Sequence, residues 1–78
     1  MHIVIAKVDQ NLFDGEAESI TVPASTGEMT VLPEHMPLIT TLKAGCITLR
    51  VSDEAKPRQF QIKNGVLEVR RDGATVIL

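Results

Sequence analysis

The stretch RQFQIKNGVLEVR, residues 58–70, decides the fold class of this chain. Its first half places Phe60 and Ile62 on one face and polar side chains on the other, which is the pattern of a half-buried β-strand. Asn64-Gly65 follows, a dipeptide typical of two-residue hairpin turns because both central positions of a type I′ turn require positive φ. The alternation then resumes in residues 66–70. The stretch therefore predicts a β-hairpin.

Similar patterns lie on both sides of this stretch. Residues 46–52, CITLRVS, place Ile47, Leu49 and Val51 on one face, which again predicts a half-buried strand. On the other side, Asp72-Gly73 indicates a tight turn into a final strand over residues 74–78. We therefore predict that the last four strands form a meander.

The N-terminal half predicts shorter strands at residues 2–8, 16–22, 28–32 and 38–42, with turns at 10–11 and 43–45 and a loop at 23–27. The segment 33–37 contains two prolines, which exclude it from a helix and from a central strand. Residues 52–56 stop at Pro57, and we interpret them as a connection rather than a helix. Short strands separated by turn signals every 8–12 residues or so predict a sandwich or a small barrel, and we favour a sandwich.

Composition excludes several classes of protein. The formal net charge is −2, Arg70-Arg71 is the only adjacent basic pair, and Phe13 and Phe60 are the only aromatic residues. This argues against a nucleic-acid-binding surface. Apolar runs are far too short to span a bilayer, and the first residues lack the features of a signal peptide. A single cysteine, Cys46, fits a reducing compartment. We expect one domain, residues 1–78, in the cytoplasm.

The sequence offers little support for catalysis or metal binding. His2, His35 and Cys46 are candidate metal ligands, but no pair of them has the short spacing of a zinc motif, so we interpret them as ordinary strand and loop residues. Glu16 and Glu18 are expected on the same face of a strand, about 7 Å apart. That spacing superficially suits acid–base chemistry, but we favour solvated charges on an exposed strand edge. We predict no catalytic residue, no metal and no cofactor.

The most informative stretch is STGEMTVLPEHMPLIT, residues 25–40. It places His35 and Met36 between two prolines and next to Leu38 and Ile39. A stiff loop with apolar and amphipathic side chains is typical of protein-binding surfaces. A connection that buries Met36 and Leu38 in the core explains the pattern equally well, so these residues alone leave both interpretations open.

The same stretch resembles the signature of the epsilon subunit of F-type ATP synthases, which is called delta in mitochondria. The family pattern is Gly-Glu, a short apolar strand, Pro-x-His-x-Pro-Leu-Leu/Ile-Thr and a Lys-x-Gly turn. In this chain the corresponding segments are Gly27-Glu28, residues 29–32, residues 33–40 and residues 43–45. Upstream, LFDGEA (12–17) and, downstream, NGVLEV (64–69) also resemble the family, so the resemblance covers essentially the whole chain.

The resemblance implies a flattened two-sheet β-sandwich of about eight to ten short strands. It also implies a non-catalytic rotor subunit of the central stalk, which links the gamma subunit to the membrane c-ring and couples proton transport to ATP synthesis. Such a subunit lies peripherally at the cytoplasmic face of the bacterial inner membrane. By position, the resemblance assigns to the c-ring side Thr26, Gly27 and Glu28. It assigns to the gamma side His35, Met36, Leu38 and Ile39.

One departure from the family concerns the end of the chain. Most bacterial members continue into a two-helix C-terminal domain, whereas this sequence ends at Leu78 within the expected last strand. We therefore expect the helical domain to be absent, and with it inhibition of ATP hydrolysis and ATP binding. The alternatives are a stand-alone ligand- or protein-binding sandwich unrelated to the synthase, a small enzyme with a metal at His2, His35 and Cys46, and a shortened relative with other partners.

Overall fold

The computed structural model describes all residues from Met1 to Leu78 and contains nine β-strands and no helix. In chain order the strands are β1 (His2–Ala6), β2 (Asn11–Glu16), β3 (Ser19–Ala24), β4 (Gly27–Val31), β5 (Leu38–Leu42), β6 (Gly45–Arg50), β7 (Arg58–Ile62), β8 (Gly65–Arg70) and β9 (Gly73–Ile77). No helix has the length and apolar character needed to cross a membrane. The prediction of an all-β fold is confirmed.

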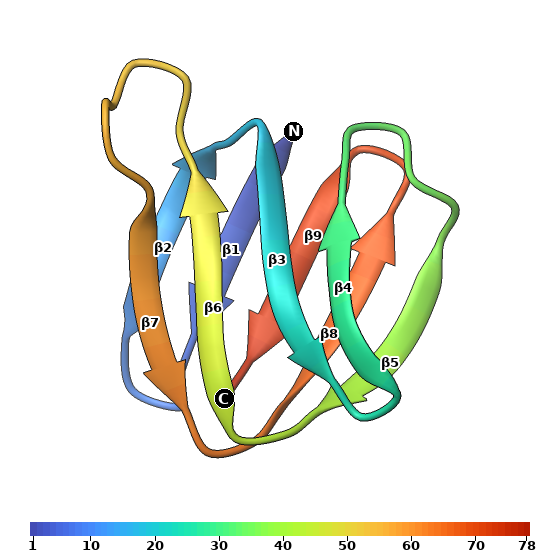
Figure 1. Cartoon of the computed structure of the whole chain (residues 1–78). Coiled ribbons are helices and arrows are strands. Elements are labelled where there is room, and N and C mark those ends of the chain that lie inside the picture. Colours follow the sequence, from blue (N-terminus) through green and yellow to red (C-terminus); the bar gives the residue numbers. More distant parts are fainter.

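The strands form two layers (Figure 1). One layer has the strand order β2-β1-β9-β8-β5, and the other contains β3, β6 and β7, with β4 paired to the free side of β3. The two layers are continuous only where β3 meets β5, through the single residue pair Ala24 and Leu42. The sheet therefore curls over at this point and packs against itself, which confirms the sandwich.

The core lies between the layers and follows from the period-two pattern of the sequence. In β6 the side chains of Ile47 and Leu49 are fully buried, and in β8 Leu67 and Val69 are buried while Glu68 between them is exposed. No polar or charged residue is buried. Sixteen residues are buried, Gly73 and the 15 apolar residues of the core, which are Ile3, Ile5, Ala17, Ile20, Val22, Ala24, Val31, Leu42, Ile47, Leu49, Ile62, Leu67, Val69, Ala74 and Val76.

One pairing unites the two halves of the chain. β1 and β9 are parallel, with His2 opposite Gly73 and Ala6 opposite Ile77, whereas all other strand pairs are antiparallel. The backbones approach so closely at Gly73 that a Cβ there would overlap the carbonyl oxygen of His2. Gly73 is therefore required by the space between β9 and β1.

The predicted meander is wrong at its centre. Asn64-Gly65 does not form a hairpin, because β7 pairs with β6 alone while β8 lies between β5 and β9. Gly65 also lacks the positive φ that a type I′ turn requires. Residues 63–64 instead carry the chain from one layer to the other. The local signal for a turn was present, but one side of β8 is occupied by β9, which follows it in the chain, and the other by β5, which is distant in the sequence.

Two further predictions need correction. No strand was predicted at Asn11–Glu16, but β2 forms there as an edge strand on β1. Its two apolar residues, Leu12 and Phe13, are adjacent and therefore show no alternation with polar residues. None of its side chains is fully buried. The loop predicted at residues 23–27 is shorter than expected, because Pro23 belongs to β3 and only Ser25-Thr26 connects β3 to β4.

Arg58 connects the free edges of the two layers. From β7, its guanidinium lies over the ring of Phe13 in β2, 5.2 Å from the ring centroid. The same guanidinium donates two hydrogen bonds to the carboxylate of Glu54, at 3.0 and 2.7 Å. These hydrogen bonds lower the pKa of Glu54 below its ordinary value and raise that of Arg58. Because the groups are exposed, we expect the ion pair to contribute modestly to stability.

We predict that Gly73→Ala lowers the free energy of unfolding by about 2 kcal/mol, because the new methyl group would force β9 away from β1. The free energy of unfolding is measured by chemical denaturation monitored by circular dichroism. Gly15→Ala in β2 is the matched control, since its Cβ would meet only the Phe13 ring at an ordinary contact distance of 3.4 Å. It should stay within about 1 kcal/mol of the original chain. Equal loss in both variants would contradict the close approach of β9 to β1.

We also predict a pH-dependent contribution from Glu54. Because folding lowers its pKa, the ion pair with Arg58 stabilises the fold above the ordinary pKa of 4.5 and loses this effect as the pH falls further. Glu54→Gln should therefore lower the midpoint of thermal unfolding at pH 7, and the difference should shrink below pH 4.5. Asp53→Asn, next to it but without an ion pair, should show no such pH-dependent difference.

Candidate functional site

The two segments that contain the predicted partner-binding residues lie at opposite ends of the sandwich (Figure 1). The β3–β4 turn lies at one end, which we call the Gly27 end, together with the connections at residues 7–10, 43–44 and 63–64. The β4–β5 loop, residues 32–37, lies at the other end, which we call the His35 end. The molecule measures 28 × 25 × 23 Å along its principal axes, and β4 runs from one segment to the other.

The β4–β5 loop is held in shape by its own backbone. The amide of His35 donates a hydrogen bond to the carbonyl of Leu32 at 3.2 Å, and the His35 Nδ1 donates to the carbonyl of Met36 at 2.8 Å. Glu34 has a φ of 66°, an uncommon backbone conformation for a residue other than glycine. These contacts and the flanking prolines hold the loop in a defined turn.

The structure separates the apolar side chains of this segment into two groups. Met36 and Ile39 are 78% and 72% exposed, whereas Leu38 is half-buried and packs against the core. Leu38 and Ile39 point in opposite directions because they are neighbours in a strand. Of the two interpretations left open by the sequence, burial in the core therefore applies to Leu38 and surface exposure to Met36.

Two adjacent shallow depressions accompany these exposed side chains. The first, of about 310 Å³, is lined by Glu34, His35, Met36, Pro37 and Arg71. The second, of about 450 Å³, is lined by Pro37, Leu38, Ile39, Glu68, Val69 and Arg70. Together they form one continuous surface, which we call the His35 surface. It combines an apolar strip with two arginines.

Arg70 and Arg71 were not among the predicted site residues. They reach the His35 surface because β8 pairs with β5, with Leu38 opposite Val69. Arg70 donates hydrogen bonds to Glu68 and Thr75, at 3.2 and 2.8 Å, whereas Arg71 is exposed and forms no salt bridge. The sequence showed the basic pair, but its position depended on a strand pairing that the sequence did not reveal.

At the Gly27 end, the β3–β4 hairpin presents the other predicted residues. Gly27 has a φ of 135°, a backbone conformation that side chains other than glycine rarely adopt, and no atom lies within 4 Å of its would-be Cβ. Thr26 and Glu28 are exposed, and Glu28 has no salt-bridge partner within the chain. The hairpin therefore offers a carboxylate to solvent on a narrow turn.

The remaining candidate residues are dispersed. His2 lies on the exposed face of β1 with Nε2 2.8 Å from Asp14 and Nδ1 3.3 Å from Glu16. His35 is in the β4–β5 loop and Cys46 is in β6, and the structure holds no group of three His, Cys, Asp or Glu side chains suited to a metal. Glu16 and Glu18 do not share a strand, because β2 ends at Glu16 and the buried Ala17 follows it. The prediction that both lie on one strand face is wrong.

The fold and the two exposed segments together define a small β-sandwich domain with a stiff apolar loop at one end and a hairpin at the other. The family model of the ATP synthase delta/epsilon chain β-sandwich domain matches residues 1–78. The chain therefore belongs to this family, as its resemblance to the epsilon subunit implied.

Individual relatives agree with this assignment. The chain is 32% identical over 77 residues to an ATP synthase epsilon chain of Herminiimonas arsenicoxydans. The aligned region covers 99% of this chain and 55% of that relative. It is 38% identical over 77 residues to ATP synthase epsilon chain 2 of Burkholderia orbicola, again over 99% of the chain and 51% of the relative. The chain thus spans about half the length of the curated relatives that it matches.

Solved structures share the fold at lower identity. A chain of the mitochondrial ATP synthase of Euglena gracilis superposes with a TM-score of 0.87 at 22% identity, covering 96% of this chain and 48% of that one. A chain from the central stalk and c-ring structure of the Tetrahymena thermophila mitochondrial ATP synthase gives a TM-score of 0.84 at 15% identity, covering 99% and 61%. At this level of identity, the similarity establishes the two-layer architecture.

Proposed function

We propose that this domain is a non-catalytic part of the central stalk of an F-type ATP synthase, where it binds the gamma subunit through the His35 surface and the c-ring through the Gly27 end. Membership of the delta/epsilon family supports this proposal. In this role the domain couples rotation of the c-ring to the gamma subunit, and catalysis belongs to other subunits. Its place is peripheral, at the cytoplasmic face of a bacterial membrane.

The exposure of Met36 and Ile39 carries the proposal. Both lie on one surface, beside two depressions, although the chain has a core in which apolar side chains of this size are buried. An apolar strip with a polar and charged rim is typical of a protein interface. Because the loop is already held by its own hydrogen bonds, binding would order few additional residues.

The proposed role also requires stiffness between the two contacts. Each layer is a hydrogen-bonded sheet, and 15 buried residues lock the layers together. The Gly27 end and the His35 end are joined directly by β4, because its first residue belongs to the hairpin and its last residue precedes the loop. A strand hydrogen-bonded to β3 transmits force with little bending.

We predict that replacing Met36 and Ile39 together by glutamate weakens binding to purified gamma subunit about tenfold or more, because the new charges would be buried in the interface without partners. Calorimetric titration measures the affinity, and circular dichroism checks the fold. Val8→Glu is the matched control, since Val8 is fully exposed at the Gly27 end. Leu38 is unsuitable for this test because it packs against the core. Unchanged affinity of the double variant would exclude the His35 surface.

A separate prediction concerns Glu28. If its carboxylate pairs with basic side chains of the c-ring loops, Glu28→Gln should weaken attachment of the domain to the c-ring while leaving gamma binding intact. Binding to immobilised c-ring at low and high salt measures this, and the original chain should lose affinity with salt more steeply than the variant. Glu18→Gln, at the opposite end, is the control. Equal salt dependence of Glu28→Gln and the original chain would argue against this contact.

A further inference from the structure

The lysines of this chain are distributed unevenly. Three of the four lie in connections at the Gly27 end, accompanied in those connections by a single carboxylate, that of Asp9. The connections at the His35 end contain the carboxylates of five residues, namely Glu18, Glu34, Asp53, Glu54 and Asp72, against the cations of two, Lys56 and Arg71. Glu28, on the β3–β4 hairpin, is the other exposed carboxylate at this end, so three lysines face two carboxylates there on a chain with a net charge of −2.

None of these lysines is used by the fold. Every salt bridge in the structure has its nitrogen partner on an arginine, on His2 or on the N-terminus. No side-chain hydrogen bond involves a lysine either. The ammonium groups of Lys7, Lys43 and Lys63 are thus free to meet a ligand.

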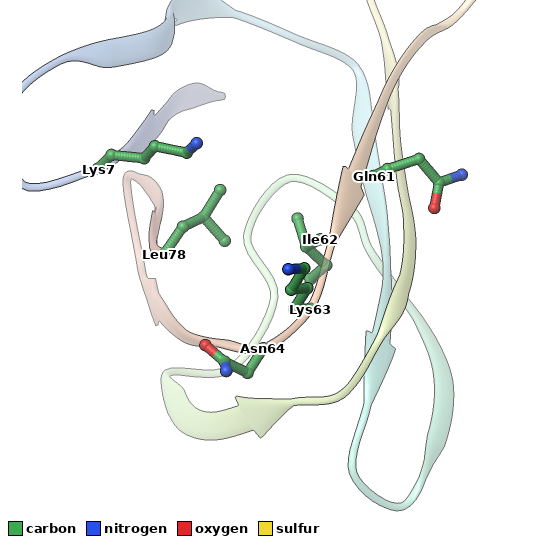
Figure 2. A pocket seen from close by; sticks show the side chains of 6 residues that line it. All are labelled: Lys7, Gln61, Ile62, Lys63, Asn64 and Leu78. Atoms are coloured by element: carbon green, nitrogen blue, oxygen red, sulfur yellow. The ribbon is translucent and has the colours of Figure 1, made fainter.

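Two of the three lysines line the same cavity. It has a volume of about 380 Å³ and is lined by Lys7, Gln61, Ile62, Lys63, Asn64 and Leu78. Figure 2 shows Lys7 and Leu78 on one side, Ile62 and Lys63 on the other, and Asn64 at the rim between them, while Gln61 points away. Because Lys7 follows β1 and Ile62 ends β7, the cavity lies between the two layers of the sandwich.

We propose that this cavity binds a phosphate group, held by the ammonium groups of Lys7 and Lys63 and by the side-chain amide of Asn64. These groups supply several N–H donors, and lysine is a frequent phosphate ligand that acts as a point charge. Ile62, which is 8% exposed, and the half-buried Leu78 form the apolar part of the lining, while Lys7, Lys63 and Asn64 are exposed to solvent. The inference does not depend on the proposed rotor function.

The arrangement favours phosphate over a single carboxylate. Two cations from separate connections face one space, and their mutual repulsion is best relieved by a ligand that carries up to two negative charges and presents oxygens in several directions. The phosphate group belongs either to a free phosphate or to the headgroup of an anionic lipid. Both sources present the same oxygens to the two lysines.

Titration of the ¹⁵N-labelled chain with inorganic phosphate, at constant ionic strength, tests the proposal. We expect saturable chemical-shift changes at residues 7, 62–64 and 78. Lys7→Gln and Lys63→Gln should each weaken binding about fivefold. Lys43→Gln, at the same end but outside the cavity, and Lys56→Gln, at the opposite end, should leave binding within about twofold of the original.

A second arm of the experiment distinguishes the two sources of phosphate. Flotation with phosphatidylcholine vesicles, with and without phosphatidylglycerol, measures binding to a lipid headgroup. Lys7- and Lys63-dependent binding to the anionic vesicles assigns the cavity to a headgroup, and saturable binding of inorganic phosphate alone assigns it to a free phosphate. The proposal is overturned if neither probe binds, if acetate produces the same shifts as phosphate, or if Lys43→Gln weakens binding as much as Lys63→Gln.

Discussion

The parallel pairing of β1 with β9 is the constraint on which the rest of the sandwich depends. Without it, the five-stranded layer would divide into the β1–β2 hairpin and the β5-β8-β9 group, because no other pairing joins them. It brings together residues from the two ends of the sequence, a non-local contact of the kind that slows folding. Its geometric requirement is concentrated at Gly73, which lies against the backbone of His2.

This closure determines the exposed surface as well as the core. With β9 fixed against β1, β8 is held between β9 and β5, and the β5–β8 register places Leu38 opposite the buried Val69. Ile39, the next residue, must then point outward. A slip of one residue would exchange the two side chains, burying Ile39 and exposing Leu38. The apolar strip beside Met36 is therefore a consequence of the same register that packs the core.

The alternation of apolar and polar residues predicted where the strands lie in the sequence better than it predicted which strands pair with each other. The apolar positions of residues 38–42, 46–51 and 58–62 became strand faces as expected, since burial imposes a period of two. Partner choice depends on tertiary packing, so Asn64-Gly65 predicted a hairpin where the chain instead changes layers. In the β4–β5 loop no period exists, and the sequence could not decide whether Met36 was buried. Arg71 was missed because only the strand order brings it beside that loop.

The arginines and the lysines of this chain differ in whether their side chains form contacts within the fold. Arg58 and Arg70 form the multiple side-chain contacts within the chain, for which a planar guanidinium with several donors is suited, whereas the lysines form none. Three of the four free lysines lie at the Gly27 end, while most loop carboxylates lie at the His35 end. Exposed apolar side chains occur at both ends, with Met36 and Ile39 at the His35 end and Val8 at the Gly27 end. Two ends that differ in loop charge in this way favour partners of different chemistry. A domain built in this way is suited to join two unlike bodies rather than two copies of one.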